Sequence, residues 1–171
     1  MLIIIDADSP FLLADDLVRR ILAEEDPSRP AQMLVVRRNE VPPCTGCLHC
    51  ITRHPGRCRL SAAFEGIRES SRGCPVVVFV GPVPFGTYSP AIKNLVDRGG
   101  LVVAEHRTCR QIVVGCGEDI TDEERSTFLD LTEKHRGTAD VVHPKVHEQV
   151  EVVVSRSFED NEAASRRILH P

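Results

Sequence analysis

Four of the seven cysteines lie in one short segment, CTGCLHCITRHPGRC, which spans residues 44–58. The spacing is C-x2-C-x2-C-x7-C, and the cysteines are Cys44, Cys47, Cys50 and Cys58. Two residues between thiolates let turns of the backbone aim successive sulfurs at one point. Three cysteines spaced in this way can wrap an iron–sulfur cubane, which a fourth cysteine closes from further along. The segment therefore predicts a [4Fe-4S] cluster on these four residues.

Two alternatives remain open for these cysteines: a zinc site, or thiols without a metal, either free or in a disulfide. Zinc knuckles usually present two separated C-x2-C pairs on opposed hairpins, whereas here the middle cysteine belongs to both short spacings. His49 and His54 lie in the same segment as substitute ligands, but histidines in loops are more often solvated. Ligand type and spacing together favour the cluster.

The other three cysteines stand alone in the sequence. Cys74 and Cys109 precede expected strands, where a buried thiol acts as a small apolar group. Cys116 lies between two glycines, which makes it a weak candidate for a redox role.

Composition narrows the class of protein. The chain has 171 residues with 21 Lys and Arg against 25 Asp and Glu, and neither sign forms a long run. We therefore expect no nucleic-acid partner and no polybasic membrane patch. No segment approaches the roughly 20 apolar residues that span a bilayer, and the first residues, MLIIID, lack a basic leader. We expect a cytoplasmic protein, in which thiols stay reduced.

Apolar runs alternate with segments of helical periodicity along the chain. The runs at residues 2–5, 33–36, 75–80 and 111–117 predict buried strands. Helices are expected after Pro10, over 61–71, over 91–98 and from about Thr121, where TDEE resembles a capping box. In the last third, Val141 and Val142 suggest a fifth strand, 150–154 another strand, and 158–169 a closing helix.

This alternation predicts an α/β fold. We expect a three-layer, doubly wound parallel sheet of the flavodoxin-like type with strand order 2-1-3-4-5. Residues 1–171 would form a single domain, with a cysteine-rich loop at about 41–60. Ligands of such sheets bind beyond the carboxyl ends of the strands. The segments DADSP, the cysteine loop, GPVPFGTYSP and GCGED all follow strands at that edge.

GPVPFGTYSP, residues 81–90, is the second informative segment. Its prolines and glycines form a stiff loop with few side chains, against whose amides a flat ring can lie while Phe85 or Tyr88 packs nearby. A flavin matches this description.

The continuation PVPFGTYSPAIKNLVDR resembles the P-V-Y-F-G-x-x-S-x-x-L-K-x-x-I-D-R segment of the NADPH-dependent FMN reductase-like flavoproteins. The cysteine segment resembles the compact motif of their iron–sulfur branch, the iron-sulfur flavoproteins. With the strand pattern, the likeness covers about residues 1–117. Lys93, Asp97 and Arg98 match the family's helix, and we interpret them as capping, ion-pairing or subunit-contact residues.

The resemblance implies a homo-oligomeric oxidoreductase or electron carrier with NAD(P)H or ferredoxin as redox partner. Electrons would pass between FMN and a nearby [4Fe-4S] cluster, with no side chain acting as a catalytic acid or base. The cluster would be held by the four cysteines named above. The implied FMN-binding residues are Ser9, Pro82, Val83, Pro84, Phe85, Gly86 and Thr87.

The first loop, DADSPFLLADD, departs from the family pattern. Ser9 and Pro10 match its G-S-P-R loop, but Asp8 replaces the glycine and Phe11 the arginine. The acidic residues would surround the FMN phosphate with negative charge; they are Asp6, Asp8, Asp15 and Asp16. Two further hypotheses therefore stay open: a flavin-free, cluster-binding electron-transfer subunit, and a zinc-stabilised interaction domain without enzymatic activity.

Overall fold

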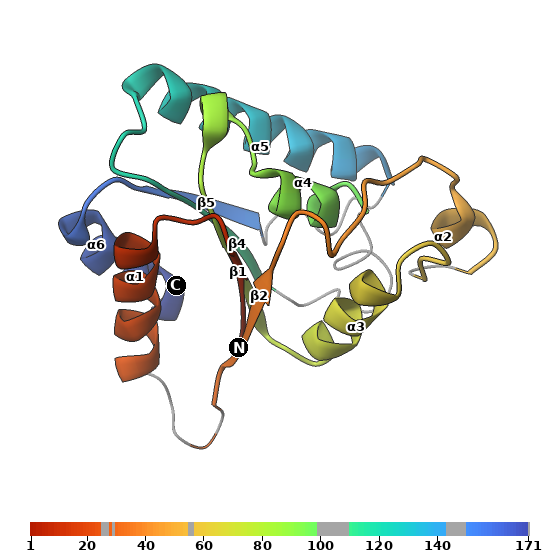
Figure 1. Cartoon of the computed structure of the whole chain (residues 1–171), viewed down its shortest axis with the longest axis horizontal. Helices are drawn as coiled ribbons and strands as arrows, with labels where there is room; N and C mark the ends of the chain where they lie inside the picture. Colours follow the sequence, from red (N-terminus) through yellow and green to blue (C-terminus); the bar gives the residue numbers. More distant parts are fainter. Residues whose placement is uncertain (25–27, 29, 55–56, 99–109, 143–149, 171) are drawn as a thin grey trace.

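The computed structural model describes residues 1–24, 28, 30–54, 57–98, 110–142 and 150–170 (Figure 1). Within this part of the chain, five parallel strands form one sheet in the order β2-β1-β3-β4-β5. The strands are β1 (Leu2–Asp6), β2 (Gln32–Val36), β3 (Val76–Gly81), β4 (Arg110–Cys116) and β5 (Val150–Ser155). The predicted fold and strand order are confirmed.

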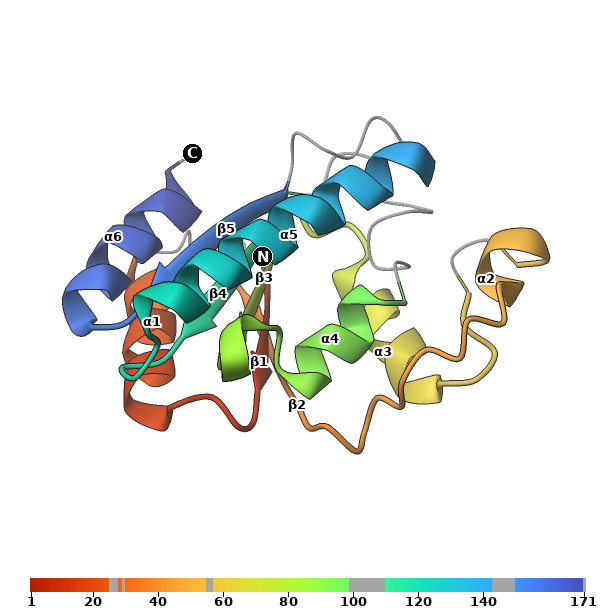
Figure 2. The same cartoon turned by 90° about the horizontal axis from the view of Figure 1, so that it is seen from above.

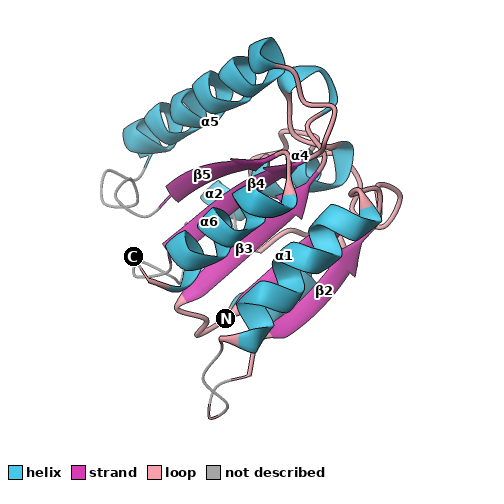
Figure 3. Cartoon of the chain, turned by 90° about the vertical axis from the view of Figure 1, so that its left-hand side faces the viewer, coloured by secondary structure: helices cyan, strands magenta, loops and turns pink. Residues whose placement is uncertain are grey.

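Helices cover both faces of the sheet (Figure 3). One face is covered by α1 (Phe11–Ala23) and α6 (Phe158–Leu169), and the other by α3 (Ala62–Ser71), α4 (Pro90–Val96) and α5 (Asp122–Val142). Successive residues of β1 alternate between the two layers, with Ile3 packed in the α1 layer and Ile4 in the α3 layer. Coverage on both faces explains why the central strands are continuously apolar.

The last third of the chain differs from the prediction. Val141 and Val142 belong to helix α5 and form no strand, and the fifth strand is β5. The helix starts at a reciprocal cap, in which the Thr121 N–H donates to Glu124 Oε2 (3.0 Å) and the Glu124 N–H donates to Thr121 Oγ1 (3.2 Å). A cap of this kind favours a helix, and two β-branched residues at its far end are too few to override it. Pro144 lies outside the described residues.

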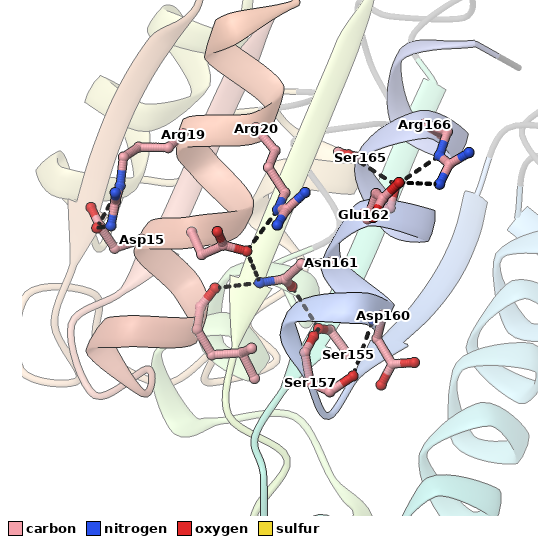
Figure 4. Close-up of polar contacts among 12 residues, drawn as sticks. Asp15, Arg19, Arg20, Ser155, Ser157, Asp160, Asn161, Glu162, Ser165 and Arg166 are labelled. Carbon is pink, nitrogen blue, oxygen red and sulfur yellow. Dashed lines mark hydrogen bonds and ion pairs between the residues drawn. The ribbon is translucent and has the colours of Figure 1, made fainter.

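A buried asparagine joins helices α1 and α6 (Figure 4). Asn161 Nδ2 donates to the Leu13 carbonyl (2.8 Å) and to Asp16 Oδ2 (3.0 Å), and Asn161 Oδ1 accepts from Ser155 Oγ (2.6 Å). Burial raises the pKa of Asp16, but hydrogen bonds from Arg20 and Asn161 outweigh burial and hold it below its usual value. The network fixes the first turns of α1, which border the carboxyl edge of the sheet.

None of the described helices is both long enough and apolar enough to cross a membrane.

Candidate functional sites: a cysteine pocket and an acidic cleft

The loop between β2 and α3 brings the four clustered cysteines to one hollow. We call this hollow the cysteine pocket; its lining residues are Cys44, Thr45, Cys47, Leu48, His49, Cys50, Cys58, Arg59, Leu60 and Arg98. All four cysteines are free thiols, two of them exposed and two half-buried. All four predicted cluster ligands thus line the same hollow.

Two residues with left-handed backbone shape this loop. Gly46 has a φ of 65° and Leu48 a φ of 55°. Glycine adopts this conformation without cost, whereas a leucine loses about 1–2 kcal/mol there. Leu48 is the N-cap of the short helix α2 (His49–Thr52), which carries Cys50 and was not predicted. The turn at Leu48 thus redirects the chain between the second and third cysteines.

The sulfur atoms influence one another's protonation. Burial raises the pKa of Cys50, and the negative charges of Cys44, Cys58 and Cys47 raise it further. The pKa of Cys47 is lowered, mainly because the backbone N–H of His49 donates to its sulfur. Thiolates are the forms that bind iron or zinc, so the lowered pKa of Cys47 favours its ligand form over that of Cys50.

The sequence interpretation named Arg98 as a capping, ion-pairing or subunit-contact residue but did not place it beside the cysteines. It is 7 % exposed, and its Nη1 donates to Cys58 Sγ over 2.7 Å. Its Nη2 donates to the carbonyls of Pro42 (2.5 Å) and Pro43 (3.2 Å), just before the first cysteine. A buried cation at the end of α4 therefore holds the cysteine loop at two places.

The expected ion pairing on this helix is present between Lys93 and Asp97. Arg98 instead reaches a sulfur forty residues earlier in the chain. No local pattern could have indicated that contact, because it depends on how α4 and the loop pack.

The start of α3 fixes the fourth cysteine. Glu65 Oε1 accepts the backbone N–H of Cys58 (2.5 Å), and Glu65 Oε2 pairs with Arg68 Nε (3.0 Å). At the other end of the loop, Asn94 Nδ2 of α4 donates to the Val41 carbonyl (2.7 Å). Side chains of α3 and α4 thus anchor the cysteine loop at both ends.

The described residues form no ready-made site for a single metal ion. Among the residues that the structure describes, no three His, Cys, Asp or Glu side chains lie close enough together to hold one metal ion. A tetrahedral zinc needs all four sulfurs at about 2.3 Å from one point. In a [4Fe-4S] cubane each cysteine binds a different iron.

A larger hollow, which we call the acidic cleft, lies at the carboxyl edge of the sheet. It has a volume of about 540 Å³. Its lining residues are Pro10, Leu12, Leu13, Pro82, Val83, Pro84, Phe85, Cys116, Gly117, Glu118, Asp119, Ile120 and Glu124. They come from the segments after β1, β3 and β4, the edge where doubly wound sheets bind ligands.

The predicted flavin-binding residues divide into two groups. Pro82, Val83, Pro84 and Phe85 line the acidic cleft, whereas Ser9, Gly86 and Thr87 are not among its lining residues. Ser9 Oγ instead donates to the Val80 carbonyl (3.5 Å), and Thr87 Oγ1 to the Pro84 carbonyl (3.0 Å). Gly86 packs against α5, where an added Cβ would lie 2.7 Å from Thr127 Cβ. These three residues shape the loops behind the cleft.

Phe85 combines a strained backbone with an exposed ring. It lies in the 3-10 turn η1 (Pro84–Gly86) with φ 53° and ψ 35°, and it is 89 % exposed. The backbone N–H of Phe85 donates to the carboxylate of Glu124 on α5. Strain that the surroundings maintain is common at binding sites. The exposed ring at the edge of the cleft is a surface on which a flat aromatic ligand could stack.

Near the cleft, carboxylates of the chain itself accept hydrogen bonds from backbone N–H groups. The Asp8 N–H donates to Asp6 Oδ1 (2.9 Å), and Glu124 accepts from Thr121 and Phe85. These hydrogen bonds, with that of Thr121 first, lower the pKa of Glu124 and keep it ionised.

The charge around a bound phosphate would be negative. Asp15 and Asp16 are offset by ion pairs with Arg19 and Arg20, so two of the four predicted acidic charges are balanced. No Lys, Arg or His is among the described lining residues. The cleft therefore suits a flat uncharged ring and is a poor match for the phosphate of FMN.

The two hollows share no lining residue. In Figures 1 and 2, α2 lies at one end of the molecule, and η1 lies on the other side of α4. Within one chain, the cysteine pocket and the acidic cleft are therefore separate sites.

Cys74 and Cys116 do not line the cysteine pocket. Cys116 is buried at the acidic cleft, where burial raises its pKa to about 12, so its thiol stays protonated. Cys74 is half-buried, and its sulfur donates to the Ser70 carbonyl. Cys109 lies outside the described residues.

Comparisons with known proteins relate the chain through its fold. No family model matches it, and no curated protein matches it. Among solved structures it is similar to the Trp repressor binding protein from Bacillus subtilis, with 14 % identity, a TM-score of 0.57 and coverage of 97 % of this chain and 96 % of that one. It is also similar to Smu.1420 from Streptococcus mutans UA159, with 8 % identity, a TM-score of 0.62 and coverage of 98 % and 95 %. At these identities the likeness shows the fold alone: the chain is flavodoxin-like over nearly its whole length.

Proposed function

We propose that this protein is an electron-transfer oxidoreductase that binds a [4Fe-4S] cluster through Cys44, Cys47, Cys50 and Cys58. One observation carries the proposal. The four free thiols line one pocket, and the buried guanidinium of Arg98 donates to the sulfur of Cys58 (2.7 Å).

The residues of the cysteine pocket have distinct roles in this proposal. The four thiolates bind the cluster, which when present exchanges single electrons. Arg98 places a positive charge and a hydrogen bond at one ligand sulfur, and such contacts raise the reduction potential of a cluster because they stabilise its more negative, reduced form. Glu65 orients Cys58 through its backbone N–H.

The proposal also includes an electron donor. The fold is compatible with an oxidoreductase, and NAD(P)H or ferredoxin is the donor that the sequence resemblance suggests. A homo-oligomer is the assembly suggested by the same resemblance.

A second candidate function is an electron-transfer subunit that binds the cluster but no flavin, whereas an oxidoreductase of the kind that the sequence resembles would also hold FMN. The acidic residues Glu118, Asp119 and Glu124 favour it, because they oppose a bound phosphate. In that case the cysteine pocket keeps its role and the acidic cleft serves another ligand.

Metal and sulfide analysis after anaerobic purification and reconstitution tests the proposal. We expect about four irons and about four acid-labile sulfides per chain. A colourless protein with one zinc per chain, or with neither iron nor sulfide after reconstitution, would show the proposal to be wrong.

A further inference from the structure

We propose that the acidic cleft binds a planar, uncharged aromatic ring and selects against ligands that carry a phosphate. The ring of a phosphate-free flavin and that of a quinone share this chemistry. The inference depends on the cleft alone and holds whether or not the cysteine pocket carries a cluster.

The apolar wall of the cleft provides the binding surface. Pro82 and Pro84 stiffen one side, Leu12 and Ile120 contribute aliphatic surface, and the exposed ring of Phe85 lies at the edge. A volume of about 540 Å³ lies within the range of pockets for small organic ligands, about 300–1,000 Å³. Stiff apolar walls with an aromatic edge favour flat rings.

The charged residues of the cleft determine which rings are accepted. Glu118, Asp119 and Glu124 are its ionisable lining carboxylates, and no cation is among the described lining residues. Arg156 lies nearby, with its Nη1 3.5 Å from the Ile120 carbonyl, but the same nitrogen pairs with Asp122 (2.6 Å). A dianionic phosphate would meet repulsion without a compensating partner.

The backbone amides of the loops also disfavour a bound phosphate. Phosphates usually bind to free backbone N–H groups at the start of a helix. Before α1, the Asp8 N–H is already bonded to the buried Asp6, whose Oδ2 has no hydrogen-bond partner in the described part of the chain. Near η1, the Phe85 N–H is bonded to Glu124. Carboxylates therefore already occupy the positions where a phosphate would find donors.

A ligand series tests the inference directly. Riboflavin, lumiflavin and FMN carry the same ring and differ in side chain and phosphate, and their binding is followed by flavin fluorescence at low ionic strength. We expect similar affinities for riboflavin and lumiflavin and at least about tenfold weaker binding of FMN. Added salt should narrow this difference, because it screens the repulsion of FMN.

Two variants and a control test which residues of the cleft disfavour FMN and which hold the ring. The double variant Glu118→Gln with Asp119→Asn should strengthen FMN binding about tenfold and leave riboflavin within about twofold. Glu123→Gln is a single-charge control, because it removes one charge from the same region at a residue that does not line the cleft. Phe85→Ala should weaken riboflavin and lumiflavin equally.

A naphthoquinone without charged substituents distinguishes the two sources of the ring. Displacement of riboflavin by this quinone assigns the cleft to quinones, and failure to displace assigns it to phosphate-free flavins. Equal or tighter binding of FMN than of riboflavin overturns the proposal, as does the absence of binding by every ring in the series.

Discussion

The cysteine pocket and the acidic cleft are built in opposite ways. The cysteine pocket belongs to a long loop whose position depends on a few side chains of α3 and α4, above all Arg98 and Glu65. The acidic cleft is formed where β1, β3 and β4 end, so the backbone of the sheet sets its shape. One site is thus sensitive to single polar contacts, and the other to packing behind its walls.

The two sites also differ in charge. A buried guanidinium faces the sulfurs of the cysteine pocket, whereas three carboxylates line the acidic cleft. The first environment stabilises negative charge and the second opposes it. Under the two proposals, the difference distinguishes a site for a thiolate-bound cluster from a site for an uncharged ring, and four experiments test it.

The largest effect is expected from Cys47→Ser. Loss of one of four cluster ligands should lower the iron content from about four per chain to near zero. The side chain is exposed, so the circular dichroism spectrum and riboflavin binding at the acidic cleft should not change. Cys74→Ser is the control, because Cys74 does not line the pocket and should leave the iron content intact. Equal iron in both variants would contradict the assignment of ligands.

Arg98→Leu should affect the cysteine pocket in two ways. Loss of charged hydrogen bonds to Cys58 and to two carbonyls should lower the free energy of unfolding of the metal-free protein by about 2–3 kcal/mol, measured by urea denaturation. The reduction potential of the bound cluster should also fall, because a positive charge beside a sulfur is removed. Arg98→Lys should restore part of the potential. An unchanged reduction potential in Arg98→Leu would show that Arg98 does not influence the cluster.

Gly115→Ala tests the dependence of the cleft on packing. An added Cβ would collide with Val83 and lie 2.9 Å from Phe128 Cε1. We expect a loss of about 1–3 kcal/mol in stability and weaker ring binding, with iron content unchanged. Gly66→Ala is the matched control on α3, where a Cβ meets nothing within 4 Å and should stabilise the helix by about 0.5–1 kcal/mol. Similar stability in the two variants would contradict tight packing behind the cleft.

The smallest effect is a dependence on alkaline pH. Burial raises the pKa of Cys116 from 9.0 to about 12, so between these values the unfolded chain loses a proton that the folded chain keeps. Stability should therefore fall as pH rises above 9, by roughly 1 kcal/mol at pH 10. Cys116→Ala should flatten this part of the curve relative to the parent protein in urea melts between pH 8 and 10. A slope unchanged by the substitution would show that Cys116 is not responsible.

The sequence was most informative where a pattern is local. Buried strands such as LIII, the cap at Thr121 and the spacing of the four cysteines each depend on neighbouring residues, and the strand order followed from their alternation. Val141 and Val142 were assigned wrongly, because two β-branched residues cannot distinguish a strand from the end of a long helix.

Features that depend on tertiary packing could not be predicted. Arg98 meets Cys58 only because α4 packs beside the cysteine loop. The segment GCGED was expected at the ligand edge, but the sequence did not show that Glu118 and Asp119 would share a cleft with Phe85. The sequence also did not show that the two sites are separate, because both follow strands that end at the same edge of the sheet.

The central claim is that the cysteine pocket binds a [4Fe-4S] cluster, and low-temperature electron paramagnetic resonance of the anaerobically reconstituted, dithionite-reduced protein tests it most directly. The account predicts the signal of a reduced cubane at about one spin per chain, absent in Cys47→Ser and present in Cys74→Ser. A parent protein that gives no such signal and retains no iron would contradict it.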